Sequence, residues 1–214
     1  MICGLTHCLS LILCLGISSS TYAVWDIVAW DPPFDYQGQM RPILYQPIEE
    51  ASQPWHLCVT YPHLKDPYWL SVNYGMVEEV KRLGVTMKVL EAGGYPELTT
   101  QIEQLKHCTN AASDAIIVGT VSFNGLSPSI RKIAQTTPVI AAVNDIENIG
   151  ISAKAAVSWY SMGQKVGQYL AQRHPTNVTN EAKVAWFPVP KESGWVVFIN
   201  DVFHDGIADT AVRI

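Results

Sequence analysis

Residues Leu57–Met76 (LCVTYPHLKDPYWLSVNYGM) decide the fold of this chain. The stretch begins with a short apolar strand, Leu57–Tyr61, passes through a loop with two prolines, and reaches a helix that opens at Leu70. Strand, loop and helix in this order are typical of an open α/β sheet, where ligands bind at the carboxyl ends of strands beside helix N-termini. The loop ends in the aromatic pair Tyr68 and Trp69, which are costly to expose unless something packs on them. The stretch therefore predicts a receptor for a small ligand that is apolar on its surface yet carries charge.

The composition favours a folded domain and argues against binding to nucleic acids. Of the 214 residues, 48% are hydrophobic and 15% are charged, which allows a buried core and disfavours disorder. The net charge is −5, and Lys and Arg form no basic run. Because phosphate contacts need clustered Lys and Arg, no nucleic-acid partner is expected.

The N-terminal residues 1–23 have the features of an export signal. They contain no Lys, Arg, Asp or Glu, and the apolar run Leu9–Ile17 has the length of a signal-peptide core, too short to span a bilayer. Small residues at Thr21 and Ala23 suit cleavage after Ala23. We therefore expect a signal peptide at 1–23 and a periplasmic chain. A buried N-terminal helix is the alternative, but the run has no polar face.

Cleavage after Ala23 would leave two cysteines, Cys58 near the start of the first strand and Cys108 near the end of the second helix. An oxidising compartment favours one disulfide between them. In a doubly wound sheet the second helix crosses over the first strand, so the two side chains could meet. Two separate buried thiols remain the alternative, because the sequence does not supply the Cα distance that a bridge needs.

Residues 55–150 alternate strands and helices in a pattern that predicts an α/β lobe with a doubly wound parallel sheet. The preceding segment, 24–54, is rich in Pro, Gln and aromatic residues and is expected to be an extended N-terminal arm. The expected strands of the lobe are Leu57–Tyr61, Thr86–Leu90, Asp114–Gly119 and Pro138–Val143.

Residues 151–214 are expected to form a hinge and an incomplete second α/β lobe, because they hold only the opening units of another sheet. A helix is predicted at Trp159–Arg173, a strand at Lys183–Phe187 and a further helix from Gly194. In the first of these helices the apolar residues are expected to face inward, while two glycines allow close packing. The apolar residues are Met162, Val166 and Leu170, and the glycines are Gly163 and Gly167.

Loops at the carboxyl ends of the predicted strands carry a set of aromatic and polar residues, which parallel strands bring to one edge of the sheet. The candidates for a ligand site are Asp66, Tyr68, Trp69, Tyr95, Asn144, Asp145 and Trp159. Aromatic ring faces attract a methylated cation by ~0.5–2 kcal/mol per ring, so the set suits a quaternary ammonium. Stacking on a sugar would use the same rings, and packing between lobes is the alternative for any single ring.

No motif for catalysis or for metal binding accompanies these residues. Glu91–Gly94 lacks the glycine spacing of a dinucleotide fingerprint, and no Gly-x-Ser-x-Gly elbow occurs. The six histidines are scattered without metal-ligand spacing and are expected at the surface. An enzyme is therefore disfavoured, and no cofactor is expected.

Several motifs carry a resemblance to a known family: Leu57–Met76, Val89–Tyr95, Val143–Asn144, Trp159 and Met162–Gly163. Together with the α/β alternation and the export signal, they make the chain resemble the type I periplasmic binding proteins of the ribose-binding class. Within that family the chain is most similar to the periplasmic sensors of trimethylamine-N-oxide (TMAO).

The resemblance implies a two-lobed protein that takes TMAO between its lobes and passes occupancy to the periplasmic domain of a membrane sensor histidine kinase. It implies a cage around the trimethyl head formed by Tyr68, Trp69, Tyr95 and Trp159. It also places Asp66 near the oxide, where an ionised carboxylate cannot donate and would have to orient a donor, hold a water or attract the positive end. The chain stops about two thirds of the way through the length that the family implies. Since closure around a ligand needs both lobes, we expect this polypeptide alone to bind TMAO poorly or not at all.

Two other functions remain open from the sequence. The same fold serves as the sugar-binding component of ABC importers, although a sugar site would be expected to hold Arg and none occurs in these loops. A scaffolding fragment without a ligand is the second alternative.

Overall fold

The computed structural model describes residues 24–35, 38–176, 181–188, 190 and 193–214. The signal peptide expected at 1–23 lies outside these residues. The chain divides into two compact units, Met1–Ile48 and Glu49–Ile214. The division falls within the segment that the sequence assigns to an N-terminal arm.

The first unit holds an antiparallel hairpin. Strand β1 (Trp25–Asp31) pairs with β2 (Gln39–Tyr45) in a register that ends with Asp31 opposite Gln39. Most residues of both strands are exposed. The hairpin gives regular pairing to a segment for which the sequence predicts only an extended arm.

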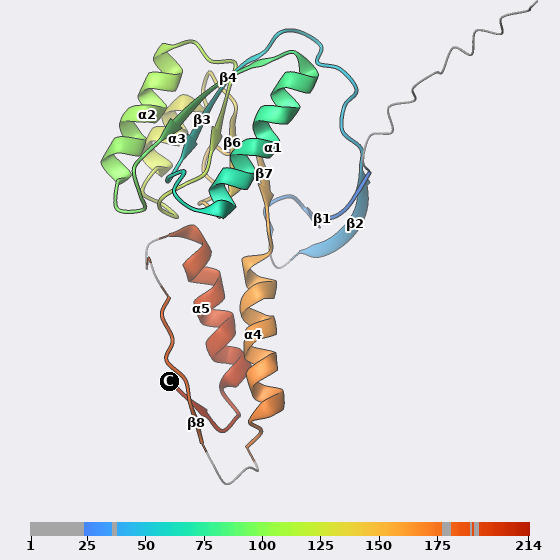
Figure 1. Cartoon of the computed structure of the whole chain (residues 1–214), viewed down its shortest axis with the longest axis vertical. Coiled ribbons are helices and arrows are strands. Elements are labelled where there is room, and N and C mark those ends of the chain that lie inside the picture. Colours follow the sequence, from blue (N-terminus) through green and yellow to red (C-terminus); the bar gives the residue numbers. More distant parts are fainter. Residues whose placement is uncertain (1–23, 36–37, 177–180, 189, 191–192) are drawn as a thin grey trace, which may run out of the picture. The chain divides into compact units, whose positions relative to one another are not determined.

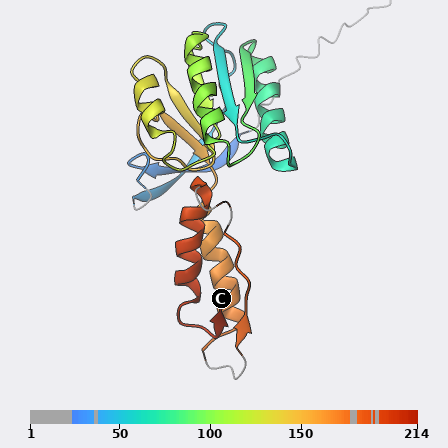
Figure 2. The same ribbon diagram turned by 90° about the vertical axis from the view of Figure 1, so that its left-hand side faces the viewer.

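The second unit is built on a parallel sheet of five strands in the order β4-β3-β5-β6-β7. Its strands are β3 (His56–Tyr61), β4 (Thr86–Glu91), β5 (Ala115–Val118), β6 (Val139–Val143) and β7 (Ala153–Ala156). Helix α1 (Pro67–Leu83) lies on one face, and helices α2 (Leu98–Asn110) and α3 (Ser127–Ile133) lie on the other (Figure 1 and Figure 2). This is the doubly wound sheet that the sequence predicts.

Helix α1 begins three residues earlier than the sequence suggests. Asp66 has extended backbone angles, and its carboxylate accepts a hydrogen bond from the Trp69 N–H at 2.9 Å, which makes Asp66 the N-cap. Pro67 occupies the first helical position, where a missing N–H costs nothing. Tyr68 and Trp69 therefore lie on the first turn of a helix. The helix ends at Gly84 in the left-handed conformation, as predicted.

The side chains of β3 alternate between the two faces of the sheet. Val59 and Tyr61 join Trp69 and Val143 in a buried apolar cluster, and Val72 of α1 packs against it. This cluster forms the core on the α1 face and lies directly beneath the carboxyl edge of the sheet.

A disulfide ties the first strand of the sheet to α2. Cys58 and Cys108 are both fully buried, and their Cα atoms lie 5.7 Å apart. The sequence left a bridge and two separate thiols as alternatives, and the structure has the bridge. The last turn of α2 is thereby fixed to β3.

Helices α4 (Trp159–Arg173) and α5 (Gly194–Ile207) follow the sheet and pack closely on each other. A Cβ on Gly163 would lie 2.7 Å from the carbonyl oxygen of Ile199, and a Cβ on Gly167 would lie 3.1 Å from the Cα of Gly206. The prediction that these glycines permit close packing is confirmed.

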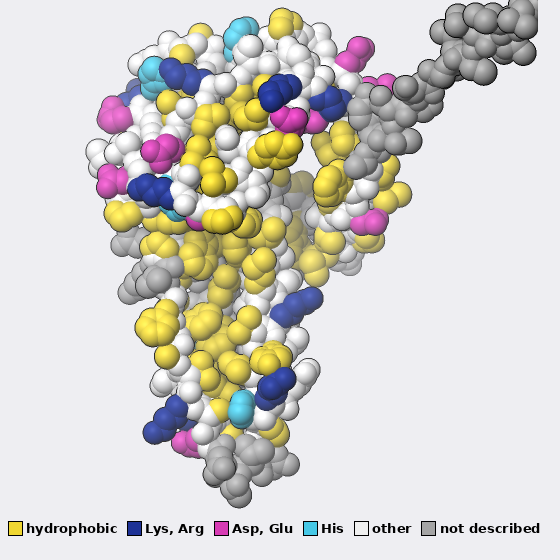
Figure 3. All heavy atoms as spheres, viewed as in Figure 1, with side chains coloured by type: hydrophobic (Ala, Val, Ile, Leu, Met, Phe, Trp, Pro, Cys, Tyr) yellow, Lys and Arg dark blue, Asp and Glu magenta, His cyan; other side chains and the backbone are white. Residues whose placement is uncertain are grey.

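The expected inward face of α4 is wrong for two of its three apolar residues. Met162 and Val166 are each 45% exposed, because the glycine face of the helix packs on α5 instead. Leu170 does pack, against the cluster around Phe203. Hydrophobic side chains accordingly gather on the surface over α4 and α5 (Figure 3).

Two short strands complete the described chain. Strand β8 (Ala182–Lys183) pairs in parallel with β9 (Val212–Arg213). The strand predicted at Lys183–Phe187 therefore ends after its first residue, and Trp186 instead stacks on Phe203 at 4.0 Å between ring centroids. Among the described helices, none is long and apolar enough to cross a membrane.

Candidate ligand-binding site

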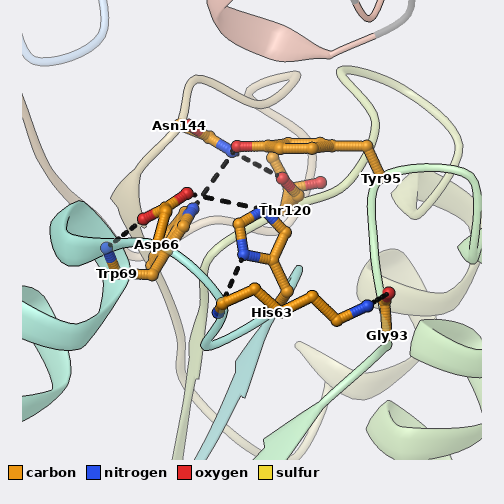
Figure 4. A network of polar contacts seen from close by, with 8 residues as sticks. His63, Asp66, Trp69, Gly93, Tyr95, Thr120 and Asn144 are labelled. Atoms are coloured by element: carbon orange, nitrogen blue, oxygen red, sulfur yellow. Dashed lines mark hydrogen bonds and ion pairs between the residues drawn. The ribbon is translucent and has the colours of Figure 1, made fainter.

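The carboxyl edge of the sheet brings together residues from four separate segments. Trp69 comes from the first turn of α1, Tyr95 from the loop after β4, Thr120 from the loop after β5, and Asn144 from the residue that follows β6 (Figure 4). The convergence predicted from the order of the loops is therefore present for these residues.

The hydroxyl oxygen of Tyr95 is the meeting point of these residues. The indole Nε1–H of Trp69 donates to it at 3.4 Å, and the Nδ2 of Asn144 donates to it at 3.2 Å. Asn144 also donates to the carbonyl oxygen of Thr120 at 2.8 Å and is 2% exposed. The Asn144 amide is thus held by the loop after β5 and presents a donor to Tyr95.

A second set of contacts holds the loop after β3 against the loop after β4. The Nε2 atom of His63 lies 3.7 Å from the Oδ2 atom of Asp66, and the His63 ring meets Tyr95 edge-on with 5.6 Å between centroids. The Nζ atom of Lys65 donates to the carbonyl oxygen of Gly93 at 2.6 Å.

The prediction that the histidines lie at the surface is wrong for His63. Its side chain is only 14% exposed, because the ring fills the space between Asp66 and Tyr95. The sequence feature that could have indicated this burial is that His63 occupies the same short loop as Asp66.

The predicted cage rings differ in their accessibility. Tyr68 is 46% exposed and Tyr95 is half-buried, whereas Trp69 is 2% exposed. The Trp69 ring packs on Tyr61 at 5.3 Å and meets Tyr68 edge-on at 6.1 Å. Trp69 therefore forms the wall behind the two tyrosines and belongs to the core as well as to the site.

Burial, followed by the proximity of Tyr95, raises the pKa of the Tyr68 hydroxyl above its ordinary value. The Tyr68 phenol consequently stays protonated at neutral pH. It can then offer a hydrogen-bond donor as well as a ring face.

Trp159 and Asp145 make other contacts. The Nε1 of Trp159 donates to the Val143 carbonyl oxygen at 3.0 Å, and its half-buried ring lies 5.8 Å from that of Trp195. The Oδ1 of Asp145 accepts from the Nζ of Lys154 at 2.6 Å, in an ion pair whose side chains are 5% and 8% exposed. The Asp145 carboxylate is therefore engaged inside the protein, whereas Trp159 packs against the cluster that contains Trp69.

Gln101 on α2 is a residue that the sequence reasoning missed. Its Nε2 donates to the Thr60 hydroxyl at 3.1 Å and to the Gly119 carbonyl at 2.8 Å, and its Oε1 accepts from the Val121 N–H at 2.9 Å. Gln101 is fully buried. It positions the loop that carries Thr120, and its only sequence signal was a polar residue beside the apolar stripe of α2.

The chemistry of this edge suits binding. It offers two accessible phenol rings, their hydroxyls and the carboxylate of Asp66. Within the described residues, no group of three or more His, Cys, Asp or Glu side chains could hold a metal ion.

Comparison with known proteins identifies the family. The model of the family described as periplasmic binding proteins and sugar binding domain of the LacI family matches residues 54–207. The chain belongs to this family. The fold class predicted from the sequence is thereby confirmed.

Two similar proteins narrow the comparison. The chain is 40% identical over 167 residues to the periplasmic protein TorT of Escherichia coli K12. The aligned region covers 77% of this chain and 47% of TorT. It is 47% identical to an ABC transporter solute binding protein from Bradyrhizobium sp. BTAi1 solved with bound bis-tris, with a TM-score of 0.71 and coverage of 88% of this chain and 57% of that one.

A third relative is a chain in the complex between the TorS sensor domain and TorT, solved without ligand. It is 39% identical, with a TM-score of 0.62 and coverage of 74% of this chain and 54% of that one. The chain spans about half the length of the curated relatives that it matches.

These relatives confirm the resemblance to a TorT-like periplasmic binding protein and the periplasmic localisation. The signal peptide at 1–23, the boundaries of the arm at 24–54, the lobe at 55–150 and the partial second lobe at 151–214 stay predictions.

Proposed function

We propose that this chain is the ligand-binding part of a periplasmic sensor that takes TMAO between two lobes and regulates a membrane sensor histidine kinase. Similarity to TorT supports the proposal, as does the solved complex of the TorS sensor domain with TorT in the presence of TMAO. Membership of the periplasmic binding proteins supports a binding protein rather than an enzyme.

The observation that carries the proposal is the placement of Tyr68 and Tyr95 at the carboxyl edge of the sheet beside Asp66. TMAO is a neutral zwitterion whose methyl groups carry positive charge and whose oxide needs a hydrogen-bond donor. Each ring face stabilises a methylated nitrogen by ~0.5–2 kcal/mol, and a phenol can also donate to the oxide.

Each residue has a distinct proposed role. The faces of Tyr68 and Tyr95 contact the methyl groups, and Trp69 supports them from behind. The Asp66 carboxylate attracts the positive end of the ligand. Trp159, the first residue of α4, contributes a further ring to the cage. We assign no ligand contact to Asp145 because it is paired with Lys154.

Affinity depends on how completely the ligand is enclosed. Binding between two lobes gains most of its contacts on closure, and this chain covers about half of its curated relatives. The isolated 214-residue chain is therefore proposed to bind TMAO weakly.

Titration of the purified chain with TMAO, trimethylamine, betaine and ribose, followed by tryptophan fluorescence, tests the proposal. We expect TMAO to change the fluorescence at a lower concentration than the other three compounds, and we expect Tyr68→Ala to lose that response. Tyr169→Ala is the matched control, because Tyr169 is 53% exposed on α4, compared with 46% for Tyr68. An unchanged TMAO response in Tyr68→Ala would contradict the proposed site.

A second candidate function is the solute-binding component of an ABC importer, including a sugar importer. It is favoured by the 47% identity to the Bradyrhizobium solute binding protein over 88% of this chain. Ribose that binds more tightly than TMAO in the same titration would support this candidate over the sensor.

A further inference from the structure

The Tyr95 hydroxyl is surrounded by hydrogen-bond donors rather than acceptors. Its oxygen accepts from the indole Nε1–H of Trp69 at 3.4 Å and from the Nδ2 of Asn144 at 3.2 Å. These two groups have hydrogens to give and no lone pair to offer at those nitrogens. The hydroxyl must therefore send its own hydrogen in another direction.

Both donors are fixed by their surroundings. The second hydrogen of the Asn144 amide goes to the Thr120 carbonyl oxygen at 2.8 Å, which sets the orientation of the amide. The Trp69 ring is 2% exposed and packs on Tyr61. Neither group can turn away from Tyr95 without breaking buried contacts.

The O–H of Tyr95 has no acceptor in the part of the chain that the structure describes. Within the described residues its hydroxyl takes part in two hydrogen bonds, and it is the acceptor in both. Tyr95 is half-buried at the carboxyl edge of the sheet, the edge at which open α/β folds bind their ligands. The neighbouring Asp66 carboxylate accepts from the Trp69 backbone N–H and, when ionised, has no hydrogen to give.

We propose that the Tyr95 hydroxyl donates the hydrogen bond that recognises an acceptor atom attached to a methylated nitrogen. Tyr95 thereby determines specificity for an amine oxide over a methylated ammonium of the same size. This inference rests on the proposed function and adds to it the residue that reads the oxide. The ring of Tyr95 can contact the methyl groups of both ligand classes, but its hydroxyl can donate only to the ligand that carries an oxide.

Nuclear magnetic resonance of the 214-residue chain labelled with ¹⁵N-tryptophan tests this inference. The indole N–H of Trp69 reports on the site because it donates to Tyr95, and that of Trp186 is an internal reference because it donates to Asn200 at 3.0 Å. The probes are TMAO and tetramethylammonium, which differ by one oxygen in place of one methyl group. The wild-type chain is expected to bind TMAO with a lower midpoint concentration than tetramethylammonium, because only TMAO can accept the hydrogen bond from Tyr95.

Tyr95→Phe is expected to raise the midpoint concentration for TMAO about tenfold or more, the loss expected for one hydrogen bond to a charged acceptor. The midpoint concentration for tetramethylammonium should change less than about twofold. Tyr169→Phe, on the exposed surface of α4, is the matched control and is expected to keep the preference for TMAO. Tyr68→Phe asks whether the other phenol of the site reads the oxide instead. Asn144→Asp is a second test that keeps the Tyr95 hydroxyl but turns its neighbour into an acceptor. The O–H is then drawn to the carboxylate, and the preference for TMAO is expected to be lost.

The outcomes separate this inference from the proposed function. If Tyr95→Phe keeps the full preference, or if Tyr68→Phe alone removes it, the inference is overturned while TMAO binding stands. If neither probe moves the wild-type Trp69 resonance more than that of Trp186, the proposed function and this inference are overturned together.

Discussion

Gly119 lies directly against the indole ring of Trp69, and a Cβ on Gly119 would be 2.5 Å from the Cη2 atom of that ring. Only a residue without a side chain fits between the end of β5 and the wall of the candidate site. The position of Trp69, and with it the hydrogen bond to Tyr95, therefore depends on the absence of a single methyl group.

Gly119→Ala is expected to displace the Trp69 ring and to lower the free energy of unfolding by ~1–3 kcal/mol, the usual cost of overpacking a core. Urea denaturation and the Trp69 indole resonance measure the two effects. Gly75→Ala is the control, because a Cβ there meets nothing within 4 Å. In the interior of α1 it should stabilise the helix by ~0.5–1 kcal/mol. Equal effects of the two substitutions would contradict the tight fit at Gly119.

Gln101→Leu is expected to destabilise the chain by about 2–4 kcal/mol, because it leaves the buried Gly119 carbonyl and Val121 N–H without this partner. It should also weaken any TMAO response by loosening the loop that holds Asn144. Gln172→Leu on the exposed surface of α4 is the control and should change stability by less than ~0.5 kcal/mol. A loss below ~1 kcal/mol for Gln101→Leu would show that these hydrogen bonds are dispensable.

Asp66 has a capping role that can be separated from its charge. Asp66→Ala removes the side chain that accepts from the Trp69 N–H, so it should cost ~1 kcal/mol in thermal or urea unfolding. Asp66→Asn keeps a capping oxygen and should cost much less, while it removes the charge next to the proposed site. If both variants lose the same stability, the cap is not the source of the effect.

We expect the buried hydroxyl of Tyr61 to make the free energy of unfolding fall at high pH. Burial raises its pKa to about 12, whereas a tyrosine in the unfolded chain titrates near ~10. Between these values the folded state keeps a proton that the unfolded state releases, so the free energy of unfolding falls as the pH rises, by ~2–3 kcal/mol in all.

Tyr61→Phe lacks this titration, although it also loses the hydrogen bond to the Met76 sulfur at 3.0 Å. Urea unfolding of both proteins between pH 9 and 12 should therefore show wild-type stability falling toward that of the variant. Parallel curves over that range would mean that Tyr61 ionises as readily in the folded chain as in the unfolded one.

The sequence predicted the layers of the fold because its signals were local. Apolar strands with two buried faces, helical periodicity and Gly84 at a helix end each need only neighbouring residues to be recognised. The start of α1 was placed too late because the hydrogen bond between the Asp66 carboxylate and the Trp69 N–H outweighs the loop character of a proline-rich stretch. The inward face of α4 was misjudged because the contact with α5 is made by glycines.

The candidate site was predictable in position and less so in detail. Loop order placed Tyr95 and Asn144 at one edge, which requires only the topology of the sheet. Sequence could not show that Trp69 is buried while Tyr68 is accessible, since both lie on the same helical turn. Nor could it show that Asp145 pairs with Lys154, because that contact depends on how β7 docks beside β6.

Nuclear Overhauser effects between the methyl protons of TMAO and the ring protons of the protein test the proposed binding site most directly. We expect effects to the rings of Tyr68 and Tyr95, and none to Trp186, whose ring stacks on Phe203. Effects confined to the exposed aromatic residues of α4, or absent at both Tyr68 and Tyr95 while TMAO binds, would contradict it.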